Sequence, residues 1–252
     1  MALPAAIQAQ ATFDGSTAYT QNFDMLPVYT GTSTASFTFT SNSTLPGWYY
    51  TSTEGRSSAG QYNGSAGQIY NWGSSGSDDR ALGIFTAITG GFSNTPYLAL
   101  QLRNTSGETI DSVTLTFDVE QWRRNTNAVI WSFDYLVTPE SSSKLTSTSG
   151  YTANSGGNAT SLHTGSATGL NGNTDVNRTT VSVTLTGLNW ANGDYLWLRW
   201  SSNNAVSTSS AIALDNLKVE VTSAVPEPAA IALLAGSLVL LAGFAFRRWR
   251  AN

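Results

Sequence analysis

Aromatic side chains gather in a glycine-rich part of the first third of the chain, a combination that suits sugar binding. Six lie there and one follows at the end of a predicted strand: Trp48, Tyr49, Tyr50, Tyr62, Tyr70, Trp72 and Trp122. Flat rings stack on the apolar C–H faces of sugars, while a few polar groups fix the ligand's orientation. We take these residues as the candidate glycan-binding set, against the alternative that they fill a hydrophobic core.

Two carboxylates on one strand offer a second kind of chemistry. Asp118 and Glu120 stand two residues apart, so both side chains share a strand face with Trp122. Such neighbours are about 7 Å apart, a separation that a glycoside hydrolase can use. The same pattern is that of an ordinary amphipathic strand whose acids are solvated or paired with Arg123 or Arg124. We therefore expect no catalytic residues and keep the hydrolase as the least favoured alternative.

Oxygen ligands for calcium are the third candidate chemistry. Asp24 near the start and Asp215 at the end of the last predicted strand would come together in a jelly roll. The competing interpretation is that Asp215 and Asn216 cap backbone groups at the sheet end. The oxygen-rich segment 171–177 lacks the order of an EF-hand loop and is expected to be a turn. No cofactor is expected, with structural calcium as the one candidate.

Other catalytic chemistries lack the residues that they need. His163 is the one histidine, it lies in a Gly/Ser/Thr-rich stretch, and no serine has the Gly-x-Ser-x-Gly surroundings of a nucleophile elbow. Cysteine is absent, which excludes disulfides, thiolate metal ligands and a cysteine nucleophile.

Composition restricts the partners as well. Charged residues make up 11% of the chain, against roughly 25% in ordinary soluble domains, and the net charge is −4. A nucleic-acid partner is not expected, because phosphate binding needs a basic surface. Hydrophobic residues make up 40%, enough to fill the core of one large domain.

Alternation of apolar and polar residues predicts an all-β domain over residues 12–222. The alternating or apolar segments are Phe37–Thr40, Leu98–Leu102, Val113–Glu120, Trp131–Tyr135, Val181–Thr186, Tyr195–Trp200 and Ala211–Leu214. Turn-forming Asn and Gly residues separate them. We predict a jelly-roll-type antiparallel β-sandwich. An immunoglobulin-like sandwich is the alternative, disfavoured by the length of the domain and by the missing cysteine pair.

The end of the chain predicts a transmembrane helix. Residues 229–246 carry no charge and, as a helix, would extend about 27 Å, close to the hydrocarbon thickness of a bilayer. Arg247, Arg248 and Arg250 follow, and basic residues stay on the cytoplasmic side. The preceding domain is therefore expected outside the cytoplasmic membrane, with membrane lipid as a partner.

This end also resembles a known sorting signal. Val225, Pro226, Glu227 and Pro228 precede the apolar span and the arginines, and together these residues resemble the PEP-CTERM signal over 223–252. The resemblance implies recognition by a membrane exosortase, cleavage near the Pro-Glu-Pro triplet, and delivery to the cell surface or extracellular matrix. The alternative is an ordinary tail anchor without processing.

Residues 1–11 end in Ala9-Gln10-Ala11, the small-x-small pattern that precedes a signal-peptidase cut. They lack a basic start and a full apolar stretch. We interpret residues 1–11 as the remnant of a signal peptide.

Five short segments of the expected ectodomain carry a second resemblance. They are Gln21–Pro27, Leu45–Tyr49, Asp79–Gly83, Glu120–Arg123 and Ala213–Leu217, and they resemble β-sandwich ectodomains of PEP-CTERM proteins. That resemblance implies no particular activity. The sequence thus predicts an exported, exosortase-sorted surface or matrix protein with a non-catalytic structural or adhesive role. Binding of extracellular polysaccharide is the first alternative.

Overall fold

The described part of the chain is a two-sheet β-structure. The computed structural model describes residues 10–31, 34–51, 54–58, 68–85, 95–202 and 209–222. Within these ranges the helical elements are two short 3-10 turns, η1 (Ser155–Gly157) and η2 (Asp175–Asn177), and no helix is long and apolar enough to cross a bilayer. The expected all-β sandwich is confirmed. The predicted span 229–246, the sorting signal and residues 1–9 lie outside the described residues.

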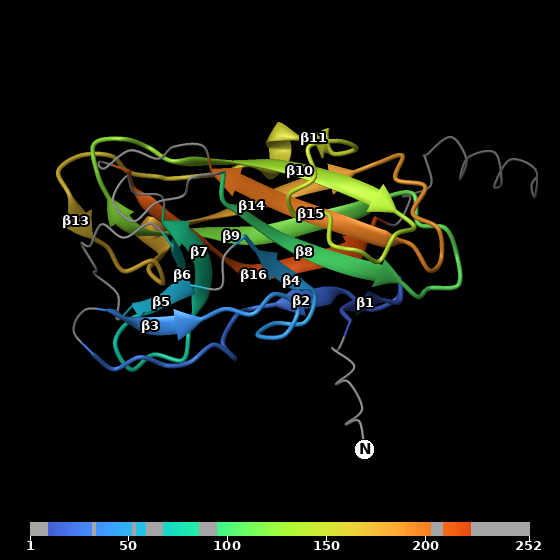
Figure 1. Ribbon diagram of the computed structural model, residues 1–252. Helices are drawn as coiled ribbons and strands as arrows, with labels where there is room; N and C mark the ends of the chain where they lie inside the picture. The colour runs from blue at the N-terminus through green and yellow to red at the C-terminus, as the bar shows by residue number, and fades with distance from the viewer. Residues whose placement is uncertain are drawn as a thin grey trace, which may run out of the picture. The chain divides into compact units, whose positions relative to one another are not determined.

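The smaller sheet has seven strands. Its order is β1 (Thr12–Phe13), β8 (Tyr97–Asn104), β15 (Tyr195–Ser202), β10 (Ile130–Thr138) and β11 (Thr152–Ala153), with β4 (Trp48–Tyr50) on β8 and β12 (Ala159–Thr160) on β10. All of its pairs are antiparallel except β1 with β8. The central strands β8, β15 and β10 lie side by side in Figure 1.

The larger sheet has nine strands. Its order is β13 (Thr168–Gly169), β9 (Val113–Arg124), β16 (Ala211–Val221), β7 (Ala81–Phe85), β6 (Gln68–Trp72), β5 (Glu54–Ser58) and β3 (Thr34–Thr38), with β14 (Arg178–Leu185) on β9 and β2 (Tyr19–Gln21) on β16. From β8 to β10, and again from β14 to β16, successive long strands alternate between the two sheets. The predicted strands at Leu98, Val113, Trp131, Val181, Tyr195 and Ala211 are all present.

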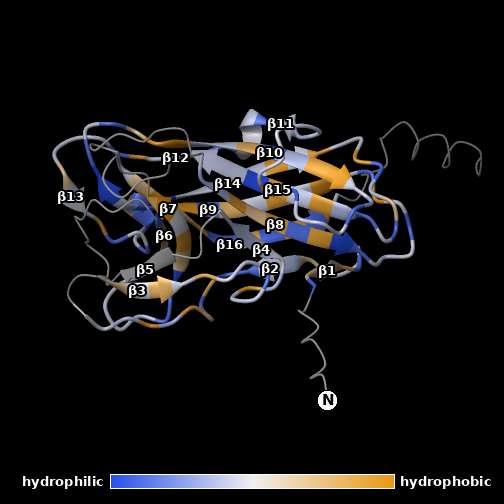
Figure 2. Ribbon diagram, in the orientation of Figure 1, coloured by the Kyte–Doolittle hydropathy of each residue, from blue (hydrophilic) through white to orange (hydrophobic). Residues whose placement is uncertain are grey.

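The core lies between the sheets and is rich in aromatic rings. Trp200 of β15 is central to it, with ring centroids 5.4 Å from Phe117, 5.1 Å from Phe133 and 6.5 Å from Trp48. Its indole nitrogen donates to the carbonyl of Gly157, so the buried polar atom is satisfied. Figure 2 shows hydrophobic residues recurring along these strands. This packing explains why the strands alternate in burial, since one face of each sheet is inside.

Pairing between β9 and β16 is irregular at two places. The register shifts between Ala211 and Ile212 and again between Asp215 and Lys218. Asn216 adopts a positive φ of 48° within the second shift, a conformation that asparagine tolerates better than most residues. Before that bulge, Asp215 pairs with Asp118 and Ala213 pairs with Glu120, on the sheet face turned away from the other sheet.

Candidate functional site

The outer face of the seven-stranded sheet presents a cluster of tyrosines. Cross-strand pairing aligns Tyr49, Ala99, Arg199 and Asp134 in one row across β4, β8, β15 and β10. Their neighbours two residues along each strand share that face. We call Tyr49, Tyr97, Tyr151 and Tyr195 the tyrosine face; each is half-buried and packs around buried Ala99, Leu145 and Trp197.

Arg199 organises this face. Its guanidinium donates two hydrogen bonds to the Asp134 carboxylate, of 2.8 and 2.7 Å, and two more to the carbonyls of Leu145 and Ser147. The same group lies 4.5 Å from the ring centre of Tyr97 and 3.4 Å from that of Tyr151. One arginine therefore holds the segment between β10 and β11 against the sheet, through a bidentate ion pair and two cation–π contacts.

Tyr49 lies at the other side of the face. Its ring centroid is 4.8 Å from that of Trp197, and its hydroxyl donates to Oε1 of Gln101 across 3.1 Å. Partial burial, followed by the neighbouring Tyr195, raises the pKa of Tyr49 above its ordinary value. The ring is thereby fixed by two partners and is half-buried, so part of it meets solvent.

The predicted glycan-binding residues separate into different environments. Tyr49 lies on the tyrosine face, and Tyr62 lies outside the described residues. The other five are buried in strands rather than exposed in loops: Trp48, Tyr50, Tyr70, Trp72 and Trp122. Tyr97, Tyr151 and Tyr195 were not in the predicted set, and only their positions on predicted or neighbouring strands could have suggested them.

The buried members form part of the molecule's packing. Trp48 and Tyr50 point into the core between the sheets. Tyr70, Trp72 and Trp122 form a second aromatic cluster, in which Tyr70 stacks on Trp72 at 4.5 Å and Trp72 on Trp122 at 6.0 Å. These side chains do not face solvent, which limits the glycan-binding interpretation to Tyr49 and its neighbours.

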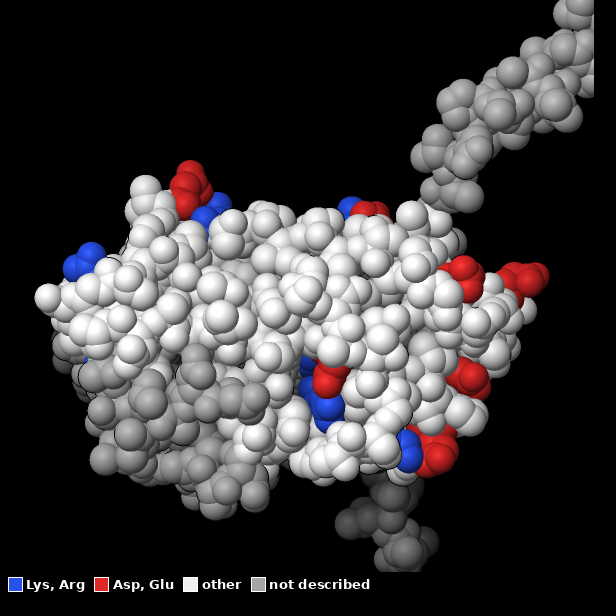
Figure 3. All heavy atoms as spheres, turned by 90° about the horizontal axis from the view of Figure 1, so that it is seen from above, with Lys and Arg blue, Asp and Glu red and all other residues white. Residues whose placement is uncertain are grey.

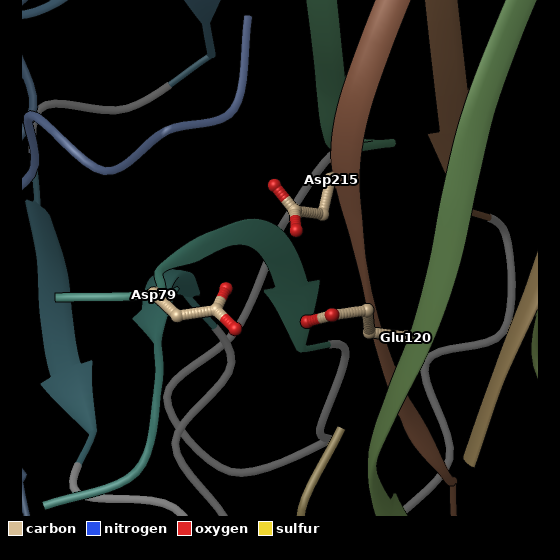
Figure 4. Close-up of side chains that lie close together, drawn as sticks. All are labelled: Asp79, Glu120 and Asp215. Carbon is tan, nitrogen blue, oxygen red and sulfur yellow. The ribbon is translucent and has the colours of Figure 1, made fainter. Parts of the chain in front are cut away.

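Three carboxylates converge beside this second aromatic cluster. Asp79 stands just before β7, Glu120 is on β9 and Asp215 is on β16, and one oxygen atom of each lies within 4.8 Å of the others. Figure 4 shows the three carboxylates turned toward a common space. We call Asp79, Glu120 and Asp215 the acidic cluster. Four of the five segments that resemble PEP-CTERM ectodomains approach it: those of Asp24, Asp79, Glu120 and Asp215.

Burial makes the charges of this cluster costly. Glu120 is 1% exposed and Asp215 is 2% exposed, whereas Asp79 is half-buried. Loss of solvent, then the neighbouring Asp79, raises the pKa of Glu120 to about 7. Loss of solvent, then Glu120, raises the pKa of Asp215 to about 8, and the pKa of Asp79 is raised by burial and by Asp24. The protein thus holds acids where their charged forms are disfavoured.

Few hydrogen bonds offset that cost. Oε2 of Glu120 accepts from the Trp122 indole across 3.1 Å, but Oε1 of Glu120 and Oδ1 of Asp215 are buried without a hydrogen-bond partner. The amide oxygen of Asn173 is likewise buried without one, while its amide nitrogen donates to the carbonyl of Asp79 at 3.4 Å. Three acceptor atoms in one neighbourhood are therefore unsatisfied, which is rare for buried polar groups.

The two residues of the predicted calcium pair lie in different surroundings. Asp24 is exposed, and its carboxylate accepts hydrogen bonds from the backbone of Arg80 and the side chain of Asn22. It is close enough to raise the pKa of Asp215, yet the carboxylates grouped with Asp215 are those of Asp79 and Glu120. The ligand chemistry was predicted at Asp215, and the neighbours that the fold supplies are different.

The remaining catalytic candidates have structural partners. Asp118 accepts from the Thr180 hydroxyl at 2.6 Å and from the Asn216 amide at 3.0 Å. Glu120, its expected companion, is enclosed in the acidic cluster. The ring of His163 bonds to the carbonyl of Val176 at 2.7 Å. Each of these three side chains is thus engaged by another group of the protein.

Comparisons with known proteins give distant similarities only. No family model matches the chain, and no curated protein matches it. A tailspike enzyme domain of bacteriophage CBA120 overlaps 70% of this chain with 10% identity and a TM-score of 0.36, but the chain spans only 19% of it. A xylan-binding domain from Paenibacillus barcinonensis overlaps 86% of this chain and 99% of its own length, with 10% identity and a TM-score of 0.36.

A third similarity is to an adhesin domain of Lys-gingipain from Porphyromonas gingivalis. It has 12% identity, a TM-score of 0.32, and covers 56% of this chain and 74% of its own length. Similarities this low place the chain in no family, so the function has to be argued from the chain's own residues.

Proposed function

We propose that this protein is a non-catalytic polysaccharide-binding protein of the bacterial cell surface, and that its ligand lies on the tyrosine face. The observation that carries the proposal is the placement of Tyr49, Tyr97 and Tyr195 on one outer sheet face, each half-buried and packed against a common apolar base. Rings held in this way offer stacking area at little entropic cost.

One exposed polar group stands beside the rings and can reach a sugar: Arg103, two residues beyond Gln101 on β8. Gln101 itself is buried, and it accepts hydrogen bonds from the Tyr49 hydroxyl and the side chain of Gln10, so it holds the Tyr49 ring in place. Asp134 and Arg199 neutralise one another and leave no net charge in the middle of the face. This mixture of apolar base and satisfied polar neighbours favours an uncharged or weakly charged saccharide.

The small number of charged groups on the surface favours a ligand that is recognised without strong charge–charge attraction. Figure 3 shows one side of the molecule, where charged atoms occur in a few small groups among uncharged ones. Hydroxyl and amide side chains supply most of the polar surface, as the composition requires. Neither nucleic acid nor a strongly charged protein is favoured by such a surface.

We propose in addition that the protein is exported and sorted to the cell surface or the extracellular matrix. The PEP-CTERM resemblance of residues 223–252 supports export, recognition by an exosortase and presentation at the surface or in the matrix. The alternation of strands between the two sheets supports a jelly-roll arrangement within the sandwich. A structural or adhesive role without a saccharide ligand is the second candidate, favoured if the tyrosine face binds no glycan.

A glycoside hydrolase is not proposed. The side chains of Glu120 and Asp215 are 1% and 2% exposed, so a polymer could not reach them without local unfolding. Asp118 is exposed enough to meet solvent, but its two oxygens are occupied by Thr180 and Asn216. Incubation of the protein with each polysaccharide should therefore release no reducing ends.

Binding is tested with the full chain in mild detergent, titrated with the producing cell's exopolysaccharide, xylan and mannan. Trp197 touches Tyr49 and serves as an internal fluorescence probe. We expect a saturable change with at least one polymer, and a loss of at least about tenfold in affinity for Tyr49→Ala. Tyr49→Phe should lose less because it keeps the ring, and Met25→Ala, at an 88% exposed position elsewhere, should bind normally.

Flat titrations with all three polymers would contradict saccharide binding and leave the structural or adhesive role in its place. Binding that is unchanged in Tyr49→Ala and Tyr195→Ala, with both variants folded by circular dichroism, would move the ligand away from the tyrosine face.

A further inference from the structure

We propose that Asp79, Glu120 and Asp215, with the amide oxygen of Asn173, form a binding site for one divalent cation of the calcium type. This site is separate from the tyrosine face, because its carboxylates lie on the outer side of the nine-stranded sheet and in the segment before β7. It does not depend on the proposed saccharide ligand.

Two buried carboxylate oxygens of the cluster lack hydrogen-bond partners. Glu120 and Asp215 are almost completely enclosed, and each has one carboxylate oxygen without a hydrogen bond. A buried acceptor in this condition costs about 1–3 kcal/mol, and more when it is charged. An ion placed among them would satisfy both oxygens, together with the unpaired oxygen of Asn173.

The acids of the cluster outnumber the basic groups that act on them. Among the ion pairs between described residues, none includes Asp79, Glu120 or Asp215. Arg178 acts on Glu120 and Asp79 but pairs with exposed Asp175 at 2.8 Å, and Arg80 interacts with Asp79 while two of its nitrogens donate to Asn71. Three adjoining acids that form no ion pair within the described residues keep an excess of negative charge, which either protons or a cation would neutralise.

The ligand set indicates which cation. All the donors are oxygens, which hard cations prefer, while zinc favours histidine and cysteine. The carboxylate oxygens lie within 4.8 Å of one another. Calcium–oxygen distances of about 2.3–2.6 Å place opposite ligands up to about 5 Å apart, whereas magnesium needs a tighter octahedron. Half-buried Asp79 provides the side from which an ion and its waters could enter.

A bound ion would connect segments that are distant in sequence. Asp79 belongs to the connection between β6 and β7, Asn173 to the loop before η2, and the other two ligands to paired strands of the sheet. The two loops already touch through Asn173 to Asp79 and through Ser74 to Asn171 at 3.0 Å. In a chain without cysteine, the ion would take the place of a covalent cross-link between these loops and the sheet.

Trp122 makes the site directly observable. Its indole donates a hydrogen bond to Glu120, so it lies beside the proposed ion and can sensitise terbium emission. The full chain, in detergent and freed of metal with chelator, should show terbium luminescence on tryptophan excitation, and added calcium should abolish it. Calorimetry should give one calcium ion per chain, and calcium should raise the melting temperature.

Glu120→Gln and Asp215→Asn keep the shape and remove the charge. Each should weaken calcium binding at least about tenfold and reduce the calcium-induced rise in melting temperature. Without metal, both variants should be at least as stable as the parent, because the amides end the repulsion between buried acids. Asp111→Asn, at an exposed acid outside the cluster, should behave as the parent in every assay.

Several outcomes would overturn the proposal. One is that millimolar calcium gives no binding heat and no shift in melting temperature. Another is that the Glu120→Gln, Asp215→Asn double variant still binds calcium. Tighter binding of magnesium or zinc than of calcium would reject the assignment of the ion. Because the metal-free melting temperature of each variant is measured alongside, a misfolded variant is recognised and not mistaken for loss of the site.

Discussion

The indole nitrogen of Trp122 donates to Oε2 of Glu120 across 3.1 Å, and this bond joins the acidic cluster to the buried aromatic cluster. Buried carboxylates and buried aromatic rings thus lie together on the outer side of the nine-stranded sheet. The aromatic rings exclude water from the carboxylates, and the carboxylate satisfies the indole.

Trp122→Phe tests this connection. The substitution keeps an aromatic ring but removes the hydrogen bond to Glu120, and we expect a loss of about 1–3 kcal/mol in the free energy of unfolding. Chemical denaturation of the metal-free protein measures it. Trp197→Phe is the comparison at another buried tryptophan, whose indole nitrogen has no hydrogen-bond partner. A smaller loss for Trp122→Phe than for Trp197→Phe would contradict the account.

Stability of the chelated protein should fall as pH rises from about 5 to about 8. Folding raises the pKa of Glu120 to about 7 and of Asp215 to about 8, from ordinary values of 4.5 and 3.8. The folded state therefore binds more protons than the unfolded state across this range, and stability decreases with increasing pH. Asp79, Asp24 and Asp118 add to the shifts, and Arg178 opposes them.

Denaturant unfolding at several pH values, in the presence of chelator, gives the slope. Asp215→Asn should flatten it, because one titrating group is gone. A parent protein whose stability rises or stays level between pH 5 and pH 8 would show that these acids do not carry the raised pKa values.

Arg199→Met should release the segment between β10 and β11. The change removes the ion pair with Asp134, two hydrogen bonds to carbonyls, and the contacts with Tyr97 and Tyr151. We expect about 3 kcal/mol of destabilisation and faster amide exchange over residues 139–151. Arg199→Lys keeps the charge but not the planar fork, so its effect should be intermediate. Unchanged exchange in that segment would refute the assigned role of Arg199.

Gly83 permits close contact between β7 and β16. A Cβ atom there would lie 2.3 Å from the carbonyl oxygen of Ile212 and 2.9 Å from Cα of Ala213. Gly83→Ala should therefore cost about 3 kcal/mol or more, since backbone would have to move. Gly107→Ala is the matched control: it meets no atom within 4 Å and bears only the strain of φ +83°. Equal melting temperatures of the two variants would disprove the close approach.

Sorting is tested by the mass of the mature protein recovered from the cell surface. Processing by an exosortase predicts a product that ends near Pro226-Glu227-Pro228 and lacks the arginines at 247, 248 and 250. Replacing Pro226, Glu227 and Pro228 together with alanine should leave the tail attached. An intact tail on surface-exposed parent protein would favour the ordinary membrane anchor.

The sequence predicted the strands well because alternation of apolar and polar residues reports directly on a sheet with one buried face. The limit of this pattern is seen in β9 (Val113–Arg124). Burial alternates there as expected up to Val119, but Glu120 is buried instead of solvated. Glu120 is bonded to Trp122, which in turn stacks on Trp72 of β6 and lies against the segment that carries Gly172. Contacts between segments that are distant in the sequence leave no local pattern of residues from which the burial of Glu120 could be predicted.

The candidate sites were predicted less completely for the same reason. Asp215 was singled out because of its place at a strand end, yet its neighbours Asp79 and Asn173 arrive from connections whose course the sequence does not specify. Tyr49 was identified from the density of aromatic residues, while Tyr195 was assigned only to a strand. Cross-strand register, which joins Tyr195 to Arg103 and Arg199 to Ala99, puts it on the same face.

The central claim, that saccharide binds to the tyrosine face, is tested most directly by hydroxyl-radical footprinting with and without bound polysaccharide, analysed by mass spectrometry. The account predicts protection of Tyr49, Tyr97 and Tyr195, with exposed Val176 and Met25 labelled equally in both states. Protection confined to any other part of the surface, with these three tyrosines labelled as in the free protein, would contradict it.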